Sequence, residues 1–260
     1  MKKILSVVIA ITMLLGMMIP MGTFAADAVE CATWDEVVAA VTADPAAGIK
    51  LTADVTANAT IASFAGSFDG NGKTVTVTTT MFSTALAGAS FKNFTMNGDT
   101  TITPFIDHVG EDSATAPITF EGITSNVNTT ITTGTAAPFI GYAEKAAIVV
   151  MTDCVSNGSL NSSNQAGAFI ARTYNNSLTA TFINCVNNGD VITTSNYAGG
   201  FIGMLDNGKH TITIDGCVNN GTISAAKSDA AADTATDNSN LCSCGDWCIV
   251  RWIKCFHQIV

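Results

Sequence analysis

The chain has 260 residues and a formal net charge of -10, with 11 lysines and arginines against 21 aspartates and glutamates. Nucleic acids and anionic membranes are bound largely through cationic contacts to phosphate, so this composition argues against both as partners. Charged residues make up only 12% of the chain, and small polar residues are abundant. This balance favours stacked strands with neutral surfaces over a charged helical exterior.

The N-terminus has the pattern of an export signal, which we assign to residues 1–25. Lys2 and Lys3 form a basic start, Ile4–Ile19 is almost wholly apolar, and Pro20 ends this run before a series of small residues. An uncleaved membrane anchor is the alternative, but the apolar run is short for a membrane span. We therefore expect a bacterial protein exported to the cell surface, the cell wall or the extracellular space, with no span left after signal cleavage.

A short amphipathic helix is predicted from Thr33 to about Thr42. Thr33 and Glu36 have the spacing of a capping box, and Val37 and Val41 lie on one apolar stripe behind them. Such a helix would close the open end of a stack of strands, whose core would otherwise attract other chains.

Beyond this helix, apolar and polar residues alternate, which predicts short strands from Ile49 onward. The segment Asp69–Lys73 indicates a tight turn, because asparagine and glycine tolerate positive φ angles. Val75 and Val77 continue as a strand after it.

One sequence unit then recurs at intervals of about 31 residues. Each copy starts with an apolar residue and ends in asparagine, usually followed by glycine. The copies are Phe91–Gly98, Phe120–Asn126, Met151–Gly158, Phe182–Gly189 and Ile214–Gly221. A second, shorter repeat that contains Phe-Ile lies between them, at Pro138–Gly141, Ala168–Ala171 and Gly200–Gly203. A fixed period indicates stacked units that bury their apolar faces against one another.

The repeat predicts an all-β fold, namely a right-handed parallel β-helix over residues 31–228 with coils of about 31 residues. Each strand would pair with the same strand of the next coil, so that like residues stack about 4.8 Å apart. Phe182, Cys185 and Phe201 would point inward, and asparagines and glycines would form the corners. A β-sandwich is the alternative, but it does not account for the constant spacing.

Two segments of the sequence resemble repeats of known protein families. Asn184–Gly189 followed by Ala198–Gly203 is similar to the GLUG-type repeat of bacterial surface proteins, which include adhesins and the repeat regions of some immunoglobulin-cleaving metallopeptidases. Phe64–Gly72 resembles the entry coil of pectate-lyase-like solenoids. The resemblance covers most of Trp34–Ser228 and implies the β-helix. It does not select a function, because this fold carries lyases, adhesins and stalks.

The end of the chain differs from the repeats. Residues 229–240 are interpreted as a low-complexity loop. Residues 241–260 contain four cysteines, namely Cys242, Cys244, Cys248 and Cys255. Their spacing matches no structural zinc pattern, and we favour a frameshift over a metal site. Codons that encode residues 241–248 can, when read one nucleotide later, encode a segment similar to Tyr197–Gly203. The shifted reading frame would then continue the repeat.

Cys154, Cys185 and Cys217 recur at the same place in successive coils. They could carry redox or metal chemistry, or they could form an internal ladder of small apolar side chains. Phe94 and Ile123 stand at the equivalent places of earlier coils, which favours the ladder. A disulfide between neighbours would require their side chains to turn toward each other.

The densest group of ionisable residues is Asp107 and His108 with Glu111 and Asp112, which we place on a loop. A polysaccharide lyase needs acidic residues to hold calcium and an arginine or lysine as base. Arg172 is the only arginine before the tail, and no adjacent coil supplies a carboxylate group at a matching position.

The acids Glu121, Asp153 and Asp215 are interpreted as solvated or turn-capping side chains, and His210 as a loop residue. The sequence contains no HExxH motif, nucleophile elbow or phosphate loop. We therefore predict no catalytic, cofactor-binding or metal-binding residue in this chain.

These observations predict a secreted or cell-surface β-solenoid that acts as a non-catalytic, adhesin-like display or binding scaffold. Its uniform threonine, serine and asparagine faces would bind glycans or host and cell-surface glycoproteins through many weak contacts. End-to-end self-association is also expected. The alternative is a carbohydrate-active β-helix enzyme, either a polysaccharide lyase or a hydrolase, or the repeat region of a larger secreted enzyme.

Overall fold

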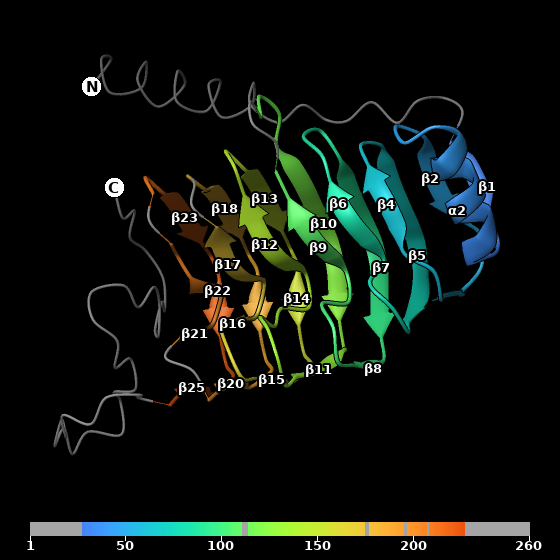
Figure 1. Cartoon of the computed structure of the whole chain (residues 1–260). Helices are drawn as coiled ribbons and strands as arrows, with labels where there is room; N and C mark the ends of the chain where they lie inside the picture. The colour runs from blue at the N-terminus through green and yellow to red at the C-terminus, as the bar shows by residue number, and fades with distance from the viewer. Residues whose placement is uncertain (1–27, 111–113, 175–176, 195–196, 207, 227–260) are drawn as a thin grey trace, which may run out of the picture.

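The computed structural model describes residues 28–110, 114–174, 177–194, 197–206 and 208–226. Over these residues the chain forms the predicted right-handed parallel β-helix, in which neighbouring strands come from successive coils and pair in parallel (Figure 1). The signal peptide predicted at residues 1–25 and the tail at 229–260 lie outside the described residues. No helix among the described residues has the length and apolar character needed to cross a membrane.

The strands form four sheets along the solenoid axis. Sheet A contains, in order of pairing, β1 (Val29–Cys31), β2 (Gly48–Leu51), β5 (Ser67–Val77), β7 (Ser90–Asn97), β10 (Ile118–Ser125), β13 (Ile148–Thr152), β18 (Thr179–Ile183) and β23 (Thr211–Asp215). Its side strands are β3 (Val55–Ala57), β14 (Val155–Ser156), β19 (Val186–Asn187) and β24 (Val218–Asn219).

The other sheets form the remaining sides of each coil. Sheet B contains β4 (Ile61–Phe64), β6 (Phe82–Ala85), β9 (Ile106–Val109), β12 (Ile140–Glu144), β17 (Ile170–Tyr174) and β22 (Ile202–Met204). Sheet C contains β8 (Asp99–Thr100), β11 (Asn128–Ile131), β15 (Leu160–Ser162), β20 (Val191–Thr193) and β25 (Ile223–Ala225). Sheet D is the short pair of β16 (Ala166–Gly167) and β21 (Ala198–Gly199).

The predicted capping helix is α2 (Trp34–Ala43), which lies at the end of the solenoid beside β1 (Figure 1). The Thr33 hydroxyl accepts from the Glu36 backbone, and the Glu36 carboxylate accepts from the Thr33 backbone at 3.1 Å. Trp34 buries its ring and donates its indole N–H to the Ala59 carbonyl at 2.7 Å. The capping box therefore starts the helix where its apolar stripe can cover the first coils.

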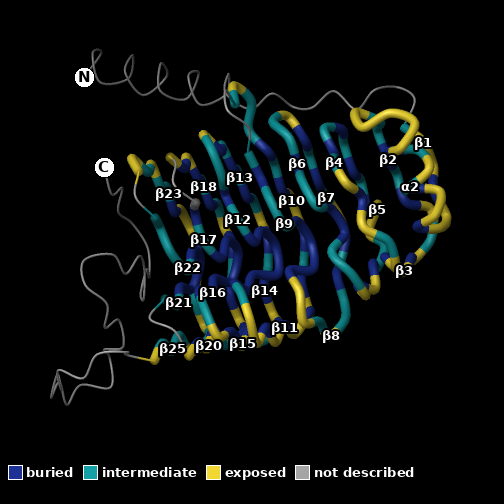
Figure 2. The backbone as a smooth tube through the Cα atoms, in the orientation of Figure 1, coloured by how far each residue is buried: buried dark blue, intermediate teal, exposed yellow. Residues whose placement is uncertain are grey.

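The core is a column of stacked apolar side chains. In sheet A, Phe91 lies in register with Phe120, and Met151 lies in register with both Phe120 and Phe182. The Phe-Ile repeat forms a second stack, in which the ring of Phe169 contacts those of Phe139 and Phe201 at centroid distances of 5.1 and 5.2 Å. Figure 2 shows that buried residues recur in the strands along the whole length of the solenoid. The inward direction predicted for Phe182, Cys185 and Phe201 is confirmed.

One corner has left-handed backbone at the equivalent position of five successive coils. Asn93, Asp153 and Asn184 have φ between 52° and 57°, and glycine takes this place at Gly122 and Gly216. Asparagine, aspartate and glycine tolerate this conformation best, so the sequence supplies suitable residues there.

The turn predicted at Asp69–Lys73 is a kink inside one long strand. Strand β5 continues through it, and the register with β7 shifts between Asp69 and Lys73. Asn71 and Gly72 have positive φ, as the turn residues require, but the neighbouring strands hold both arms in one sheet.

The coils are not all of the same length. Side chains that bridge neighbouring coils are 20 residues apart at Asn71 and Leu51, and 24 apart at Asn93 and Asp69. The separation rises to 29 residues at Asn126 and to 31 at Asn157. Sheet C begins only with β8, where the longer coils start.

Candidate functional site

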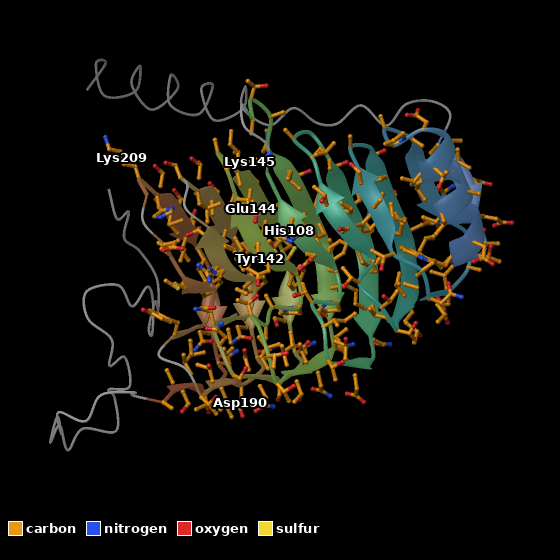
Figure 3. The ribbon with its side chains drawn as sticks, viewed as in Figure 1. His108, Tyr142, Glu144, Lys145, Asp190 and Lys209 are labelled. Atoms are coloured by element: carbon orange, nitrogen blue, oxygen red, sulfur yellow. The ribbon has the colours of Figure 1, made fainter. Side chains whose placement is uncertain are left out.

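Sheet B carries a row of polar and ionisable side chains from consecutive coils. Thr84 on β6 lies in register with His108 on β9, and His108 lies in register with Tyr142 on β12. Tyr142 is followed by Arg172 on β17. Figure 3 shows His108, Tyr142 and Glu144 gathered on this face. The stacking of the coils therefore brings together residues that are far apart in the sequence.

His108 is held between two carboxylates. Its Nε2 lies 3.3 Å from Asp107 Oδ2, and its Nδ1 lies 3.2 Å from Glu144 Oε1. The imidazole stacks on the Tyr142 ring at a centroid distance of 4.9 Å and an angle of 13°. The hydrogen bond to Asp107 is the main cause that raises the pKa of His108, although partial burial acts in the opposite direction. The charges of Asp107 and Glu144 favour the imidazolium form as well.

This arrangement limits the chemistry of the cluster. Asp107 and Glu144 contact different nitrogens of the same ring, so the two carboxylates do not converge on one point. Among the described residues, no group of three or more histidine, cysteine, aspartate or glutamate side chains is arranged to hold a metal ion. Both nitrogens of His108 are occupied, so neither is placed to take a proton from Thr84 on the neighbouring strand.

Arg172, the residue considered as a possible base, takes part in a partly buried ion pair. Its Nη2 lies 2.7 Å from Asp206 Oδ2, with side chains 18% and 17% exposed, and its Nε donates to the Thr173 carbonyl at 3.2 Å. The Asp206 backbone N–H donates to the Thr173 hydroxyl at 2.6 Å. These contacts tie β17 to the segment after β22, which is a structural role for the guanidinium group.

The corner between sheets A and C carries an exposed ladder of side-chain amides. Asn126 donates to Asn97 at 2.9 Å, and each later amide donates to the one before it at 2.8 Å, through Asn157, Asn188 and Asn220. These are the asparagines that end the sequence repeats. The ladder, defined by these five residues, is a row of neutral hydrogen-bonding groups along the solenoid.

A second, buried amide lies just inside this ladder. Asn187 is fully buried, and its Nδ2 donates to the Gly189 carbonyl at 2.9 Å and to Asn219 Oδ1 at 2.7 Å. Its Oδ1 accepts from the Gly189 N–H at 3.2 Å. Asn187 was not predicted from the sequence as a buried polar residue, although the repeated Asn-Asn-Gly of this coil and the next could have indicated it.

The three repeated cysteines lie inside the core as free thiols. Cys217 Sγ accepts from the Cys185 backbone N–H at 3.2 Å. The hydrogen bond with Cys154 is the main cause that raises the pKa of Cys185 to about 12, and burial adds to it. The bond with Cys185, together with burial, raises the pKa of Cys217 still further. Thiols in this state are poor nucleophiles and poor metal ligands, which agrees with the interpretation as an apolar ladder.

The remaining ionisable residues are placed separately. Asp153 sits in a left-handed corner, as a turn residue should, and Glu111 and Asp112 lie outside the described residues. Asp107 and His108 lie on strand β9, so the prediction of a loop is wrong for these two residues. His210 holds two segments together, because its Nδ1 accepts from the Leu178 N–H at 3.1 Å and its Nε2 lies 2.7 Å from the Asp206 carbonyl.

Tyr142 and Glu144 were not predicted from the sequence as partners of His108. The sequence does contain a pattern that indicates Tyr142. Three Phe-Ile pairs have a polar residue two positions after the isoleucine. Phe105–His108, Phe139–Tyr142 and Phe169–Arg172 then align, and they place the three polar side chains in one row.

Comparison with known proteins adds one likeness of fold. No protein-family model matches the chain, and no curated protein sequence does. Among solved structures, the chain is similar to a Bacteroides ovatus protein described as a "putative immunoglobulin A1 protease". The TM-score is 0.52 at 12% identity, over 75% of this chain and 67% of that chain. At this identity the likeness concerns the β-helix architecture alone.

Proposed function

We propose that this protein is an exported, non-catalytic β-solenoid that binds neutral glycans or glycoproteins at the cell surface through its outward faces. The observation that carries this proposal is the exposed amide ladder from Asn97 to Asn220. Sheet C extends the same neutral character near the first coils of the ladder, with Thr130 beside Asn161 in its outward row. Sugar hydroxyls both donate and accept hydrogen bonds, and regular rows of such groups favour binding by many weak contacts.

Binding to an array of neutral and charged glycans tests this proposal. We expect the folded protein to bind neutral glycans, and to keep binding them at about 0.5 M NaCl, because contacts between neutral groups are not screened. The heat-denatured protein is the control. Binding to no glycan, or binding only to charged glycans and only at low salt, would contradict the proposal.

Export is the second part of the proposal, and its support is the basic and apolar pattern of residues 1–25. The resemblance of Asn184–Gly189 to GLUG-type repeats of bacterial surface proteins supports the same location. Expression in a bacterial host should yield secreted or surface-bound protein whose new N-terminus lies near Ala26 by mass spectrometry. Protein retained in the cytoplasm with Lys2 and Lys3 still present would contradict export.

An enzyme is the second candidate, and the cluster of His108, Asp107 and Glu144 is the observation that favours it. The name of the structural neighbour points in the same direction. The protein should be incubated with polysaccharides and, separately, with immunoglobulin A1, and the products analysed for new ends. We expect no products. Products that disappear in the His108→Asn variant would overturn the non-catalytic proposal.

A further inference from the structure

The solenoid has a step in its side where short coils give way to long ones. The bonds from Asn71 and Asn93 join coils across 20 and 24 residues, whereas those from Asn126 and Asn157 span 29 and 31 residues. The short coils have no strand in sheet C, so β8 has a strand partner, β11, on one side only among the described residues. Strand β8 lies at the lower edge of the solenoid, where sheet C begins (Figure 1).

A groove of about 580 Å³ lies at this step. This volume is within the range of small-molecule sites, about 300 to 1,000 Å³. Its lining consists mainly of threonine side chains, which offer both hydroxyl and methyl groups, together with one carboxylate, one amide and one larger aliphatic side chain. The lining residues are Thr78, Thr100, Thr101, Thr130, Asp99, Asn128 and Ile102. The groove adjoins the amide ladder, because Asp99 and Asn128 follow its first two members, Asn97 and Asn126, by two residues.

Part of this lining is already ordered by internal hydrogen bonds. Asn128 Nδ2 donates to Asp99 Oδ1 at 2.9 Å, which orients both side chains across two coils. The Thr78 hydroxyl donates to the Ala57 carbonyl at 2.8 Å. Within the described parts of the chain, the hydroxyls of Thr101 and Thr130 have no such partner, which leaves them available to a ligand.

The aliphatic side chain completes the chemistry of the groove. Ile102 is one of the few large apolar residues exposed on the described surface, at 37%. A pyranose ring has an aliphatic face of C–H groups and a rim of hydroxyls, and therefore needs both an apolar contact and hydrogen-bonding groups. Asp99 and the acidic balance of the chain disfavour anionic sugars. The two-residue β8 is too short to hold an added peptide strand by backbone pairing.

We infer that this groove is a binding site for a short neutral oligosaccharide, whose ring packs on Ile102 while Thr101, Thr130 and Asp99 bind its hydroxyls. The inference rests on the proposed glycan-binding function and assigns that function to one place on the solenoid. The amide ladder would then extend the contact for longer chains along the corner of sheets A and C.

The test compares matched variants in and next to sheet C. Ile102→Ala removes the aliphatic contact, and the double variant Thr101→Val, Thr130→Val removes two hydroxyls with little change of shape. The control is Ile192→Ala, because Ile192 is 40% exposed on strand β20 of sheet C but lies outside the groove. Thermal unfolding establishes that each variant is folded, and calorimetric titration with neutral oligosaccharides that bind the parent protein measures affinity.

We expect the groove variants to lose affinity about tenfold or more, and the Ile192→Ala variant to bind as the parent does. If folded groove variants bind as tightly as the control, this site is wrong while the proposed glycan-binding function stands. If the parent binds no neutral glycan, or binds peptides at this groove instead, the site and the proposed function both fail.

Discussion

The protonation state of His108, on sheet B, affects the stability of the folded protein. The hydrogen bond to Asp107 raises its pKa in the folded protein. Protonation therefore stabilises the fold, and this contribution is complete below the pKa of the unfolded chain, about 6.5. The contribution is lost as the pH rises through the higher pKa of the folded state.

We predict that His108→Gln lowers the free energy of unfolding more at pH 5 than at pH 9. The side chain is 35% exposed, so the difference between the two pH values should be below about 1 kcal/mol. Urea unfolding at both pH values measures it, with Thr84→Val on the neighbouring strand as the control. An equal loss at both pH values would show that Asp107 and Glu144 do not favour the imidazolium.

Adjacent asparagines in one coil should differ strongly in their contribution to stability. Asn187 is fully buried and bonded to Gly189 and Asn219, whereas Asn188 is exposed in the amide ladder. We predict that Asn187→Ala costs about 2 to 4 kcal/mol, because buried polar groups lose their partners, and that Asn188→Ala costs about 1 kcal/mol or less. Denaturant unfolding of the two variants measures the difference. Similar losses would mean that the buried amide is not specifically bonded.

At the scale of the structural element, the corner between sheets A and C depends on close backbone approach. A Cβ atom at Gly189 would lie 2.0 Å from the Gly158 carbonyl oxygen, and one at Gly221 would lie 1.9 Å from that of Gly189. Gly189 follows a ladder asparagine, which explains why the repeat ends in Asn-Gly. The glycine is needed there for spacing between coils, since its φ is not in the left-handed region.

We predict that Gly189→Ala destabilises the protein by more than about 3 kcal/mol, because a methyl group would push two coils apart. Gly48→Ala is the matched control, since the nearest atom to its Cβ is the rotatable Ser67 Oγ at 3.2 Å. Thermal and urea unfolding compare the two variants. A Gly189→Ala protein as stable as the control would show that the coils can separate at little cost.

At the scale of the whole molecule, stability should vary along the axis. Strand β7 pairs with β5 and β10, and its Phe91 and Phe94 pack against several other aromatic rings. Strand β23 pairs with β18, and no other described strand covers its second edge. In a solenoid each coil contacts mainly its neighbours, so local opening can occur without unfolding the whole stack.

We predict that the amide hydrogens of β7 exchange more slowly than those of β23 in hydrogen-exchange mass spectrometry. The reason is that β7 must open between two paired strands and an aromatic core, whereas opening β23 breaks its pairing with β18 alone. Equal exchange rates in the two strands would indicate that the solenoid opens only as one cooperative unit.

Much of the fold was predictable because its determinants are local and periodic. The repeated apolar residues, such as Phe182 and Cys185, indicated which side chains point inward, and the Thr33 and Glu36 pair indicated the capping helix. The candidate site was predicted only in part. Asp107 and His108 were singled out as a cluster and do contact each other, but the other partners of His108, Tyr142 and Glu144, are a full coil away.

The sequence alone determined the period of the stack, the inward and outward faces of its strands, and the residues suited to its corners, because a strand alternates its side chains and a corner restricts its backbone wherever it lies. Only the tertiary structure decided which outward side chains meet, and where the side of the solenoid is hollowed. Those features depend on the register between coils of unequal length. The 20-residue and 31-residue separations at Asn71 and Asn157 create the step beside β8, and no single repeat contains that information.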